Sequence, residues 1–195
     1  MNSKENVKNA LQVLFKTYDN VEKLMDYCKI IAAEKTNYVA SANKFLRRKS
    51  DNDTVAWLLN DFILLFQNRN DGECESENGW RKGPIYVLEI CLGEKGSENL
   101  PLIYLSKFEY HDLNSWNEGC SPANHWGFYF PLRYDQYMDF TKEGEYKIAT
   151  PKNEKSSKTY WGLKKITTKS IDLFEVTSEN LEEKIFGEFD KLADL

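Results

Sequence analysis

The 195-residue chain contains only two histidines and four cysteines, and no two cysteines form a CxxC pair. Closed tetrahedral zinc sites use paired cysteines or histidines at short spacing. His111, Asp112, Cys120 and His125 are suitable ligand types within 15 residues, but their spacing fits neither a zinc knuckle nor a finger. We therefore predict four reduced thiols, no disulfide framework and no metal site.

The motifs of several common enzyme classes are also absent. The ten glycines are scattered, and none of them builds a GxGxxG or GxxxxGK[ST] phosphate-binding loop. The chain contains no GxSxG nucleophile turn and no HExxH zinc motif. Nucleotide-dependent and α/β-hydrolase chemistry are therefore not expected, and no cofactor is predicted.

The sequence lacks a long apolar run and an excess of positive charge. Its longest apolar cluster, residues 55–66, is interrupted by Asn60 and Asp61, so no segment is expected to span a bilayer. The first residues are charged, but no apolar stretch of signal-peptide length follows them. A formal net charge of −5 gives no positive field that would draw the whole molecule to nucleic acid or anionic lipid. These observations predict a soluble cytoplasmic protein without a membrane partner.

What the chain does contain is the composition of a folded domain. Apolar residues make up 41% and aromatic residues 14% of the chain, which is enough to offset the entropy lost on folding. No internal repeat or composition boundary divides residues 1–195, so we predict a single domain. Its helical part is expected over about 5–68, its sheet part over about 84–176, and a C-terminal helix over about 178–193.

Helical spacing dominates the first third of the chain. Apolar residues recur at alternating steps of four and three from Val7 to Ala32, which predicts one long or slightly bent helix. Asp19 and Glu22 could form a capping box, which would split this segment in two. A shorter helix is predicted over 39–48, and residues 50–53 would cap a third, central buried helix over 55–66.

The apolar period changes to that of β-strands after Gly83. Residues 85–92 and 100–110 are predicted to form an antiparallel hairpin, and residues 126–131 a third strand. Further strands are expected over 146–149, 160–166 and 171–176, with a lysine- and serine-rich tip at 152–158. Because strands follow one another without intervening helices, we predict an α+β fold. In it, N-terminal helices and a C-terminal helix pack on a mainly antiparallel sheet.

Aromatic residues are concentrated between Tyr86 and Phe140, where 12 of the 27 in the chain occur together with both histidines. Strand alternation would place His125 and Tyr129 on the outer face of the third strand, close to Trp116 in the preceding loop. Tyrosine, tryptophan and histidine together have the composition of a recognition surface. The predicted function is therefore a non-enzymatic protein that binds a protein or peptide. The alternative is that the loop covers this face and forms a second small core.

A second hypothesis is a metal-assisted hydrolase or nuclease-like enzyme. Alternation puts Lys107, Glu109 and His111 in one polar row, and Glu89 stands alone in an apolar strand. Such a row could transfer protons, although outward polar faces are ordinary in antiparallel sheets. The order Lys-Phe-Glu is the reverse of the acid-x-lysine order in nucleases of the restriction-enzyme type.

A buried carboxylate must be paired or shifted in pKa. An ion pair of Glu89 with Lys107 or Arg81 across the hairpin is the ordinary explanation. If Glu89, Lys107, Glu109 and His111 meet in one pocket, the enzyme hypothesis is strengthened.

Nucleic acid is a possible partner that the sequence does not favour. Short basic runs stand beside aromatic residues, as in Trp80-Arg81-Lys82 and in residues 152–161. Cations next to exposed aromatic rings suit single-stranded nucleic acid. Interleaved acids such as Glu154 instead favour an ordinary solvated surface.

Overall fold

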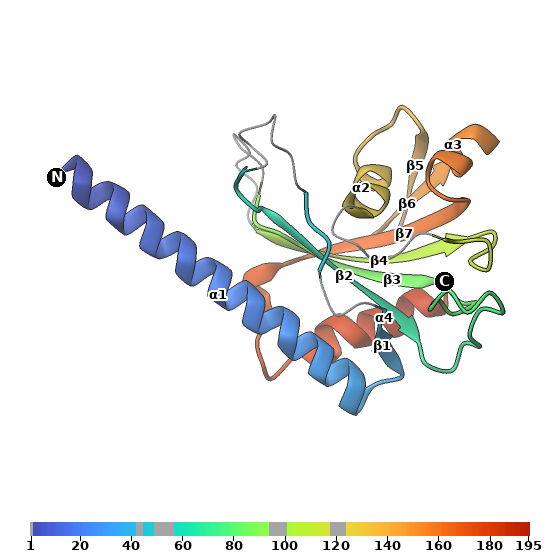
Figure 1. The fold of residues 1–195 in the computed structure, drawn as a ribbon, viewed down its shortest axis with the longest axis horizontal. Coiled ribbons are helices and arrows are strands. Elements are labelled where there is room, and N and C mark those ends of the chain that lie inside the picture. Colours follow the sequence, from blue (N-terminus) through green and yellow to red (C-terminus); the bar gives the residue numbers. More distant parts are fainter. Residues whose placement is uncertain (1, 42–44, 49–56, 94–100, 118–123) are drawn as a thin grey trace.

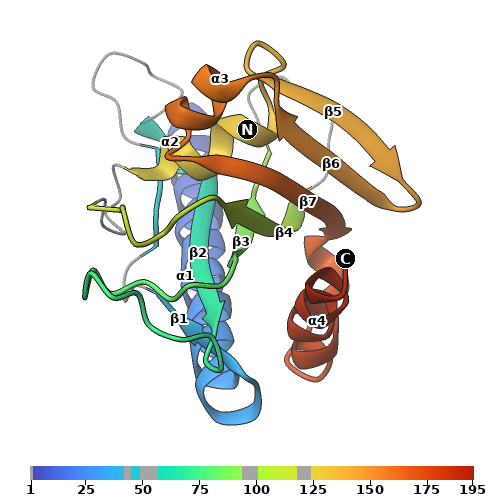
Figure 2. The ribbon, with the colours of Figure 1, turned by 90° about the vertical axis from the view of Figure 1, so that its right-hand side faces the viewer.

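A computed structural model of the chain describes residues 2–41, 45–48, 57–93, 101–117 and 124–195. Across this described part, seven strands form one antiparallel sheet in the order β1-β2-β3-β4-β7-β6-β5. Helices α1 and α4 lie on one face of the sheet, and α2 and α3 lie on the other (Figures 1 and 2). The predicted α+β fold, with an N-terminal helix, an antiparallel sheet and a C-terminal helix, is confirmed.

The strands are β1 (Tyr38–Ala40), β2 (Asp61–Asn68), β3 (Ile85–Cys91), β4 (Leu102–Tyr110), β5 (Met138–Glu143), β6 (Tyr146–Pro151) and β7 (Leu163–Asp172). The helices are α1 (Ser3–Lys35), α2 (His125–Tyr129), α3 (Glu154–Thr159) and α4 (Gly187–Ala193). Two 3₁₀ turns follow α2 and β7, at Phe130–Leu132 and Leu173–Glu175. A π-helical turn, Glu182–Phe186, runs directly into α4.

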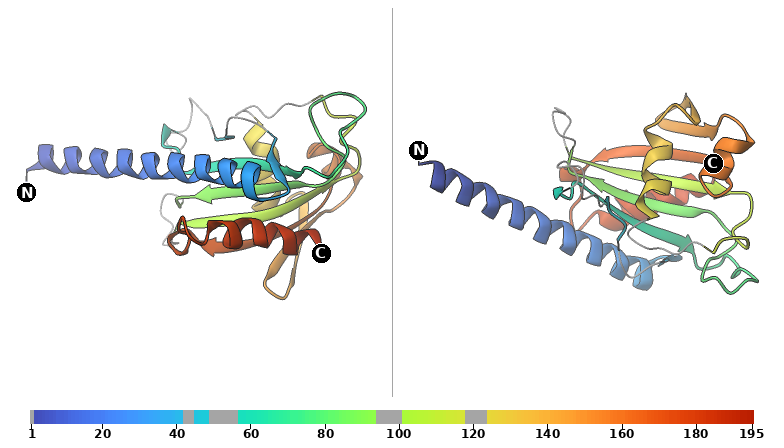
Figure 3. Two further views of the ribbon diagram at one scale, coloured as in Figure 1. Left: turned by 90° about the horizontal axis from the view of Figure 1, so that it is seen from below. Right: turned by 45° about the horizontal axis from the view of Figure 1, so that its top comes forward.

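The first helix is continuous, as its apolar period predicts. Asn2 caps it by accepting a hydrogen bond from the backbone amide of Lys4. The possible split at Asp19 and Glu22 does not occur, because both lie inside the helix. Its buried residues all belong to its C-terminal half, which lies against the sheet, while the N-terminal half projects beyond the sheet (Figures 1 and 3).

The prediction of a central helix over 55–66 is wrong. The part of the chain predicted to be helical, about 5–68, contains the strands β1 and β2 as well as α1. Residues 49–56, including the predicted cap, lie outside the described part, and Asp61–Asn68 is the strand β2. Phe62 and Leu64 face the core beneath α1, whereas Ile63 and Leu65 face the core beneath α2. A strand covered on both faces is apolar at nearly every position, and so is a fully buried helix. The apolar pattern alone therefore cannot distinguish the two. Trp57, predicted to be buried, is 71% exposed.

The shorter helix predicted over 39–48 is also wrong. Tyr38–Ala40 forms the edge strand β1, which pairs with the end of β2. Leu46 makes an isolated bridge to Ile63, and residues 42–44 lie outside the described part. Val39, Ala40 and Leu46, all within the predicted helix, therefore pair with β2.

The predicted hairpin is confirmed, with β3 and β4 paired antiparallel and Leu88 opposite Leu105. The third strand over 126–131 is wrong, because this segment forms α2 and the 3₁₀ turn after it. Strand β6 contains the predicted residues 146–149. One strand, β7, replaces the two predicted over 160–166 and 171–176, and the tip at 152–158 contains α3. Strand β5 was not predicted.

The C-terminal helix is confirmed, and its apolar residues Leu181, Ile185, Phe189 and Leu192 are buried. Glu188 fixes this helix to the sheet through polar contacts. It accepts hydrogen bonds from the hydroxyl of Tyr146 on β6 (2.7 Å) and from the amine of Lys169 on β7 (3.3 Å). The two helices α1 and α4 thus cover one face of the sheet and leave α2 alone over the centre of the other.

Candidate functional site

A column of stacked side chains runs along α2 on its face of the sheet. His125, Tyr129 and Arg133 are four residues apart, so a helical segment places them one above another. The rings of His125 and Tyr129 stack with 4.7 Å between their centroids. The Arg133 guanidinium lies 3.7 Å from the centroid of the Tyr129 ring and 5.2 Å from that of Tyr104 on β4. These contacts define the α2 column.

Two acids on neighbouring strands pair with the two ends of this column. His125 Nε2 contacts Asp61 Oδ1 on β2. Arg133 donates to Glu89 on β3 in bidentate fashion, with Nη2–Oε1 at 2.5 Å and Nη1–Oε2 at 3.1 Å. Both acids are buried, and a buried carboxylate is tolerated when it is paired and hydrogen-bonded. Arg133, and not Lys107 or Arg81, therefore explains the acid in an apolar strand.

The chain folds this way because small and aromatic residues let α2 lie close to its neighbours. A Cβ atom at Gly127 would lie 2.5 Å from the ring of Trp161. Phe128 packs against Phe108 on β4, with 5.4 Å between the ring centroids. Pro131 lies in the 3₁₀ turn Phe130–Leu132, which carries the chain to Arg133. The position of Arg133 above β3 is thus set by apolar packing.

Burial governs the electrostatics of the column. It raises the pKa of the Glu89 carboxyl, and the positive charge of Arg133 opposes that rise. Cys91 stands directly across the β2–β3 pair from Asp61. Burial also raises the pKa of the Cys91 thiol. Because the thiolate is the reactive form of cysteine, this thiol is a weaker nucleophile than an exposed one.

A hollow of about 460 Å³ opens at the arginine end of the column. We call it the arginine hollow; its lining residues are Tyr104, Tyr129, Leu132, Arg133, Tyr134 and Lys147. Lys147, on β6, donates a 2.8 Å hydrogen bond to the Leu132 carbonyl and lies 3.9 Å from the centroid of the Phe140 ring. Desolvation lowers the pKa of the Lys147 amine, and the charge of Arg133 lowers it further.

The four candidate catalytic residues do not meet in one pocket. Glu89 belongs to the α2 column, on the face of the sheet opposite Lys107, whose amine donates to the carbonyl of Ala193 at 3.2 Å. Glu109 lies 3.7 Å from Lys165 on the next strand. His111 is exposed just beyond the end of β4. Strand alternation, which puts Lys107 and Glu109 in one row, therefore separates both from Glu89.

The three candidate binding residues do not form an outward surface. Trp116 is only 5% exposed and Tyr129 only 7%, and His125 is buried with them. The alternative prediction, a second core, agrees with this arrangement. Trp116 packs edge-on against Trp80, Tyr110 and Trp161, and its indole donates to the Trp161 carbonyl at 3.0 Å. His125 and Tyr129 instead belong to the α2 column.

Sequence reasoning missed Asp61, Arg133 and Lys147. The spacing of His125, Tyr129 and Arg133 was available as a signal, but it is visible only when 125–133 is taken as helical. Asp61 was noted only as an interruption of an apolar run. Nothing local to Lys147 distinguishes it from the other lysines of the chain.

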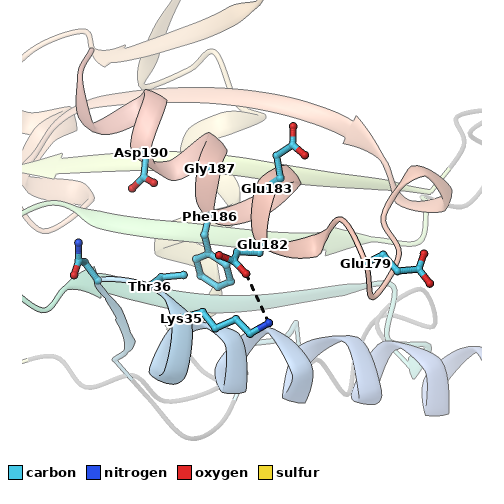
Figure 4. Close-up of a pocket in the computed structure, with 9 residues that line it drawn as sticks. Lys35, Thr36, Glu179, Glu182, Glu183, Phe186, Gly187 and Asp190 are labelled. Carbon is cyan, nitrogen blue, oxygen red and sulfur yellow. Dashed lines mark ion pairs between the residues drawn. The ribbon is translucent and has the colours of Figure 1, made fainter.

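A second hollow, of about 430 Å³, lies between the end of α1 and the C-terminal helix (Figure 4). Acidic residues dominate its lining, and two of them have partners in other elements. Glu182 lies 3.8 Å from Lys35, and Asp190 accepts a 2.9 Å hydrogen bond from the Tyr38 hydroxyl. These contacts join α1, β1 and the C-terminal helix, so the hollow is a junction between elements.

Among the described residues, no three histidine, cysteine or acidic side chains gather as a possible metal site. Of the four ligand types noted near His111, Cys120 lies outside the described part. No helix within the described ranges has both the length and the apolar character needed to cross a membrane.

No known protein family, curated protein or solved structure matches this chain, so the α2 column and the arginine hollow are described from their geometry alone.

Proposed function

We propose that the protein is a non-enzymatic binding protein, and that its arginine hollow receives an acidic side chain of a peptide or protein partner. One observation carries this proposal: Arg133, from the turn after α2, and Lys147, from β6, converge on one hollow lined by tyrosines. Glu89, on β3, pairs with Arg133 through its carboxylate.

The side chains that line the hollow support an anionic ligand. Two of them, Arg133 and Lys147, are cationic. The lowered pKa of Lys147 means that its surroundings disfavour the charged amine. A carboxylate or phosphate in the hollow would favour that charge and raise the pKa. Guanidinium, ammonium and phenol groups are all donors that such anions accept from.

The size and rim of the hollow support a peptide or protein as the carrier of the anion. Its volume lies within the range of ligand pockets, and it is large enough for an acidic side chain. Tyr134 is half exposed at its edge and offers rigid apolar area with a polar tip, as residues at protein interfaces often do. The net charge of −5 disfavours nucleic acid as the carrier.

The alternative is a metal-assisted hydrolase or nuclease. The four residues suggested as its catalytic centre do not come together in the structure. Glu89 and Lys107 lie on opposite faces of the sheet, and Glu109 and His111 have separate surroundings. The buried His125–Asp61 pair is covered by the stacked ring of Tyr129. Binding therefore accounts for the arrangement better than catalysis does.

The test is a titration of the protein with three peptides, followed by NMR: Gly-Glu-Gly, Gly-phosphoserine-Gly and the neutral Gly-Gln-Gly. The two acidic peptides should shift the signals of Lys147 and Tyr104, and the neutral peptide should not. Lys147→Gln should weaken binding of the acidic peptides about tenfold or more, because a hydrogen bond to a charged group contributes about 1.5–3 kcal/mol.

Lys155→Gln is the matched control, because Lys155 is an exposed lysine on α3 that does not line the hollow. It changes the net charge equally and should leave affinity unchanged. Equal binding of Gly-Gln-Gly would contradict the proposal. So would equal weakening by the two lysine variants, which would indicate only a general effect of net charge.

A further inference from the structure

The projecting half of α1 carries apolar side chains that the described part of the chain leaves uncovered. Val7 is 61% exposed, Leu11 46%, Val13 65% and Phe15 60%. Figures 1 and 3 show this half of the helix extending away from the sheet. Val7, Leu11 and Phe15 are four residues apart and form one contiguous row, whereas Val13 lies on another side of the helix. Contiguous exposed apolar side chains on a folded protein mark an interaction surface. An isolated helix of this length is also marginal in water without packing.

The uncovered side chains continue a stripe that is already used for packing. Val21, Met25 and Cys28 occupy the heptad stripe in the C-terminal half of α1 and are buried against the sheet. Val7, Leu11 and Leu14 continue the same stripe into the projecting half. Tyr18 stands where the two halves meet and is half-buried, with its ring edge-on to Phe62 and its hydroxyl donating to the Leu59 carbonyl at 2.9 Å. A stripe with a period of 3.5 residues is suited to packing against another helix along its length. One half of a single packing surface is therefore covered, and the other half is free to receive a helix.

The stripe leads into an apolar hollow of about 500 Å³ where the helix meets the sheet. Val21 and Leu24 line it from α1, and Leu92 and Leu173 line it from the strand ends. Phe174 completes the wall and is 72% exposed. This hollow could accept the first turns of a helix that lies along the projecting half.

We propose that two copies of this chain pair through the projecting halves of α1, with the helices antiparallel. Core layers of an antiparallel pair can place Leu11 against the partner's Leu14, and Val7 against the partner's Tyr18. Each of these contacts occurs twice, as a two-fold interface requires. The start of each helix then reaches the apolar hollow of the other copy.

The order of charges along α1 favours a second copy in this orientation. Lys4 and Lys8 outnumber Glu5 near the start of the helix, so this end is net positive. Where the helix meets the sheet, Asp19, Glu22 and Asp26 outnumber Lys23, so that end is net negative; all of these residues are exposed. Antiparallel pairing brings the lysines of each copy beside the acids of the other. Parallel pairing would align like charges with each other, which is destabilising. This proposal does not depend on the arginine hollow.

The first test is sedimentation velocity of the full chain over a wide range of concentration. The mass should rise from monomer to dimer as concentration increases. Leu11→Lys should raise the dissociation constant of the dimer at least about a hundredfold. Each buried leucine contributes about 1.5–3 kcal/mol, and two-fold symmetry counts the substitution twice. Gln12→Lys is the matched control on the adjacent, outward-facing position and should leave the dimer intact.

The orientation is tested by disulfide cross-linking. Leu11→Cys and Leu14→Cys variants should cross-link when mixed, and neither should do so alone beyond the level of the unsubstituted chain. Cross-linking of the Leu11→Cys variant alone would show parallel helices and overturn the arrangement. A chain that stays monomeric at every concentration would overturn the pairing itself and leave a helix of a different protein as the occupant. A dimer that survives Leu11→Lys would place the interface elsewhere.

Discussion

Replacing Glu89 by alanine is expected to lower the free energy of unfolding by about 3–5 kcal/mol. Arg133 reaches Glu89 with two hydrogen bonds while its guanidinium lies against the rings of Tyr129 and Tyr104. Without the carboxylate, a largely buried cation loses its counter-charge but cannot leave the ring stack without disturbing α2. Removal of one member of a buried ion pair is destabilising for this reason. Denaturant unfolding at neutral pH measures the loss.

A double substitution separates this cause from a general loss of packing. Glu89→Leu combined with Arg133→Met removes both charges and keeps apolar volume, so most of the lost stability should return. Glu154→Ala is the control for an ion pair in water. Glu154 and Lys158 form an exposed pair one helical turn apart, and breaking it should leave the unfolding midpoint unchanged. A double variant as unstable as the sum of the single variants would show that Glu89 and Arg133 do not act as a unit.

The sequence predicts those parts of the fold in which one period is repeated many times. The stripe along α1 repeats the helical period from Val7 to Ala32, so no other structure fits it. The hairpin of β3 and β4 is bounded by turn residues on both sides and was placed within a few residues. The stripe does not indicate which half of α1 packs against the sheet. Burial depends on where the sheet ends, and the sheet is assembled from segments far away in the chain.

Strand β2 shows why a buried strand was mistaken for a helix. Phe62 and Ile63 point to opposite faces of the sheet, and each face is covered by its own core. Both positions must then be apolar, and the alternation that identifies a strand disappears. The segment that forms α2 misleads in the opposite way. Its aromatic residues favour a strand by propensity, whereas tertiary packing beneath Trp161 makes it a helix.

The candidate site was located in part by one residue that did not fit its surroundings. Glu89 in an apolar strand indicated a buried pair, and the structure contains one. Its partner could not be found from sequence, because Arg133 is 44 positions away and reaches Glu89 only through the turn after α2. Lys147 arrives from β6, two strands from β4 in the sheet. These residues come together only because of the order of the strands in the sheet, and local sequence patterns do not predict that order.

Phe189→Ala is expected to cost about 3–5 kcal/mol of the free energy of unfolding, because it opens a cavity as well as losing burial. Phe189 is fully buried in α4, and its ring centroid lies 5.3 Å from that of Tyr86, 5.5 Å from that of Tyr38 and 6.0 Å from that of Phe66. It therefore joins the C-terminal helix to β1, β2 and β3 at once.

The control for Phe189 is Trp57→Ala, which removes a larger aromatic ring from an exposed position. This variant should change stability by no more than about 0.5 kcal/mol. Phe189→Leu should fall between the two, since leucine fills part of the cavity. Denaturant melts of the three variants measure the series. A loss below about 1 kcal/mol for Phe189→Ala, or one matched by Trp57→Ala, would show that the C-terminal helix packs only loosely on the sheet.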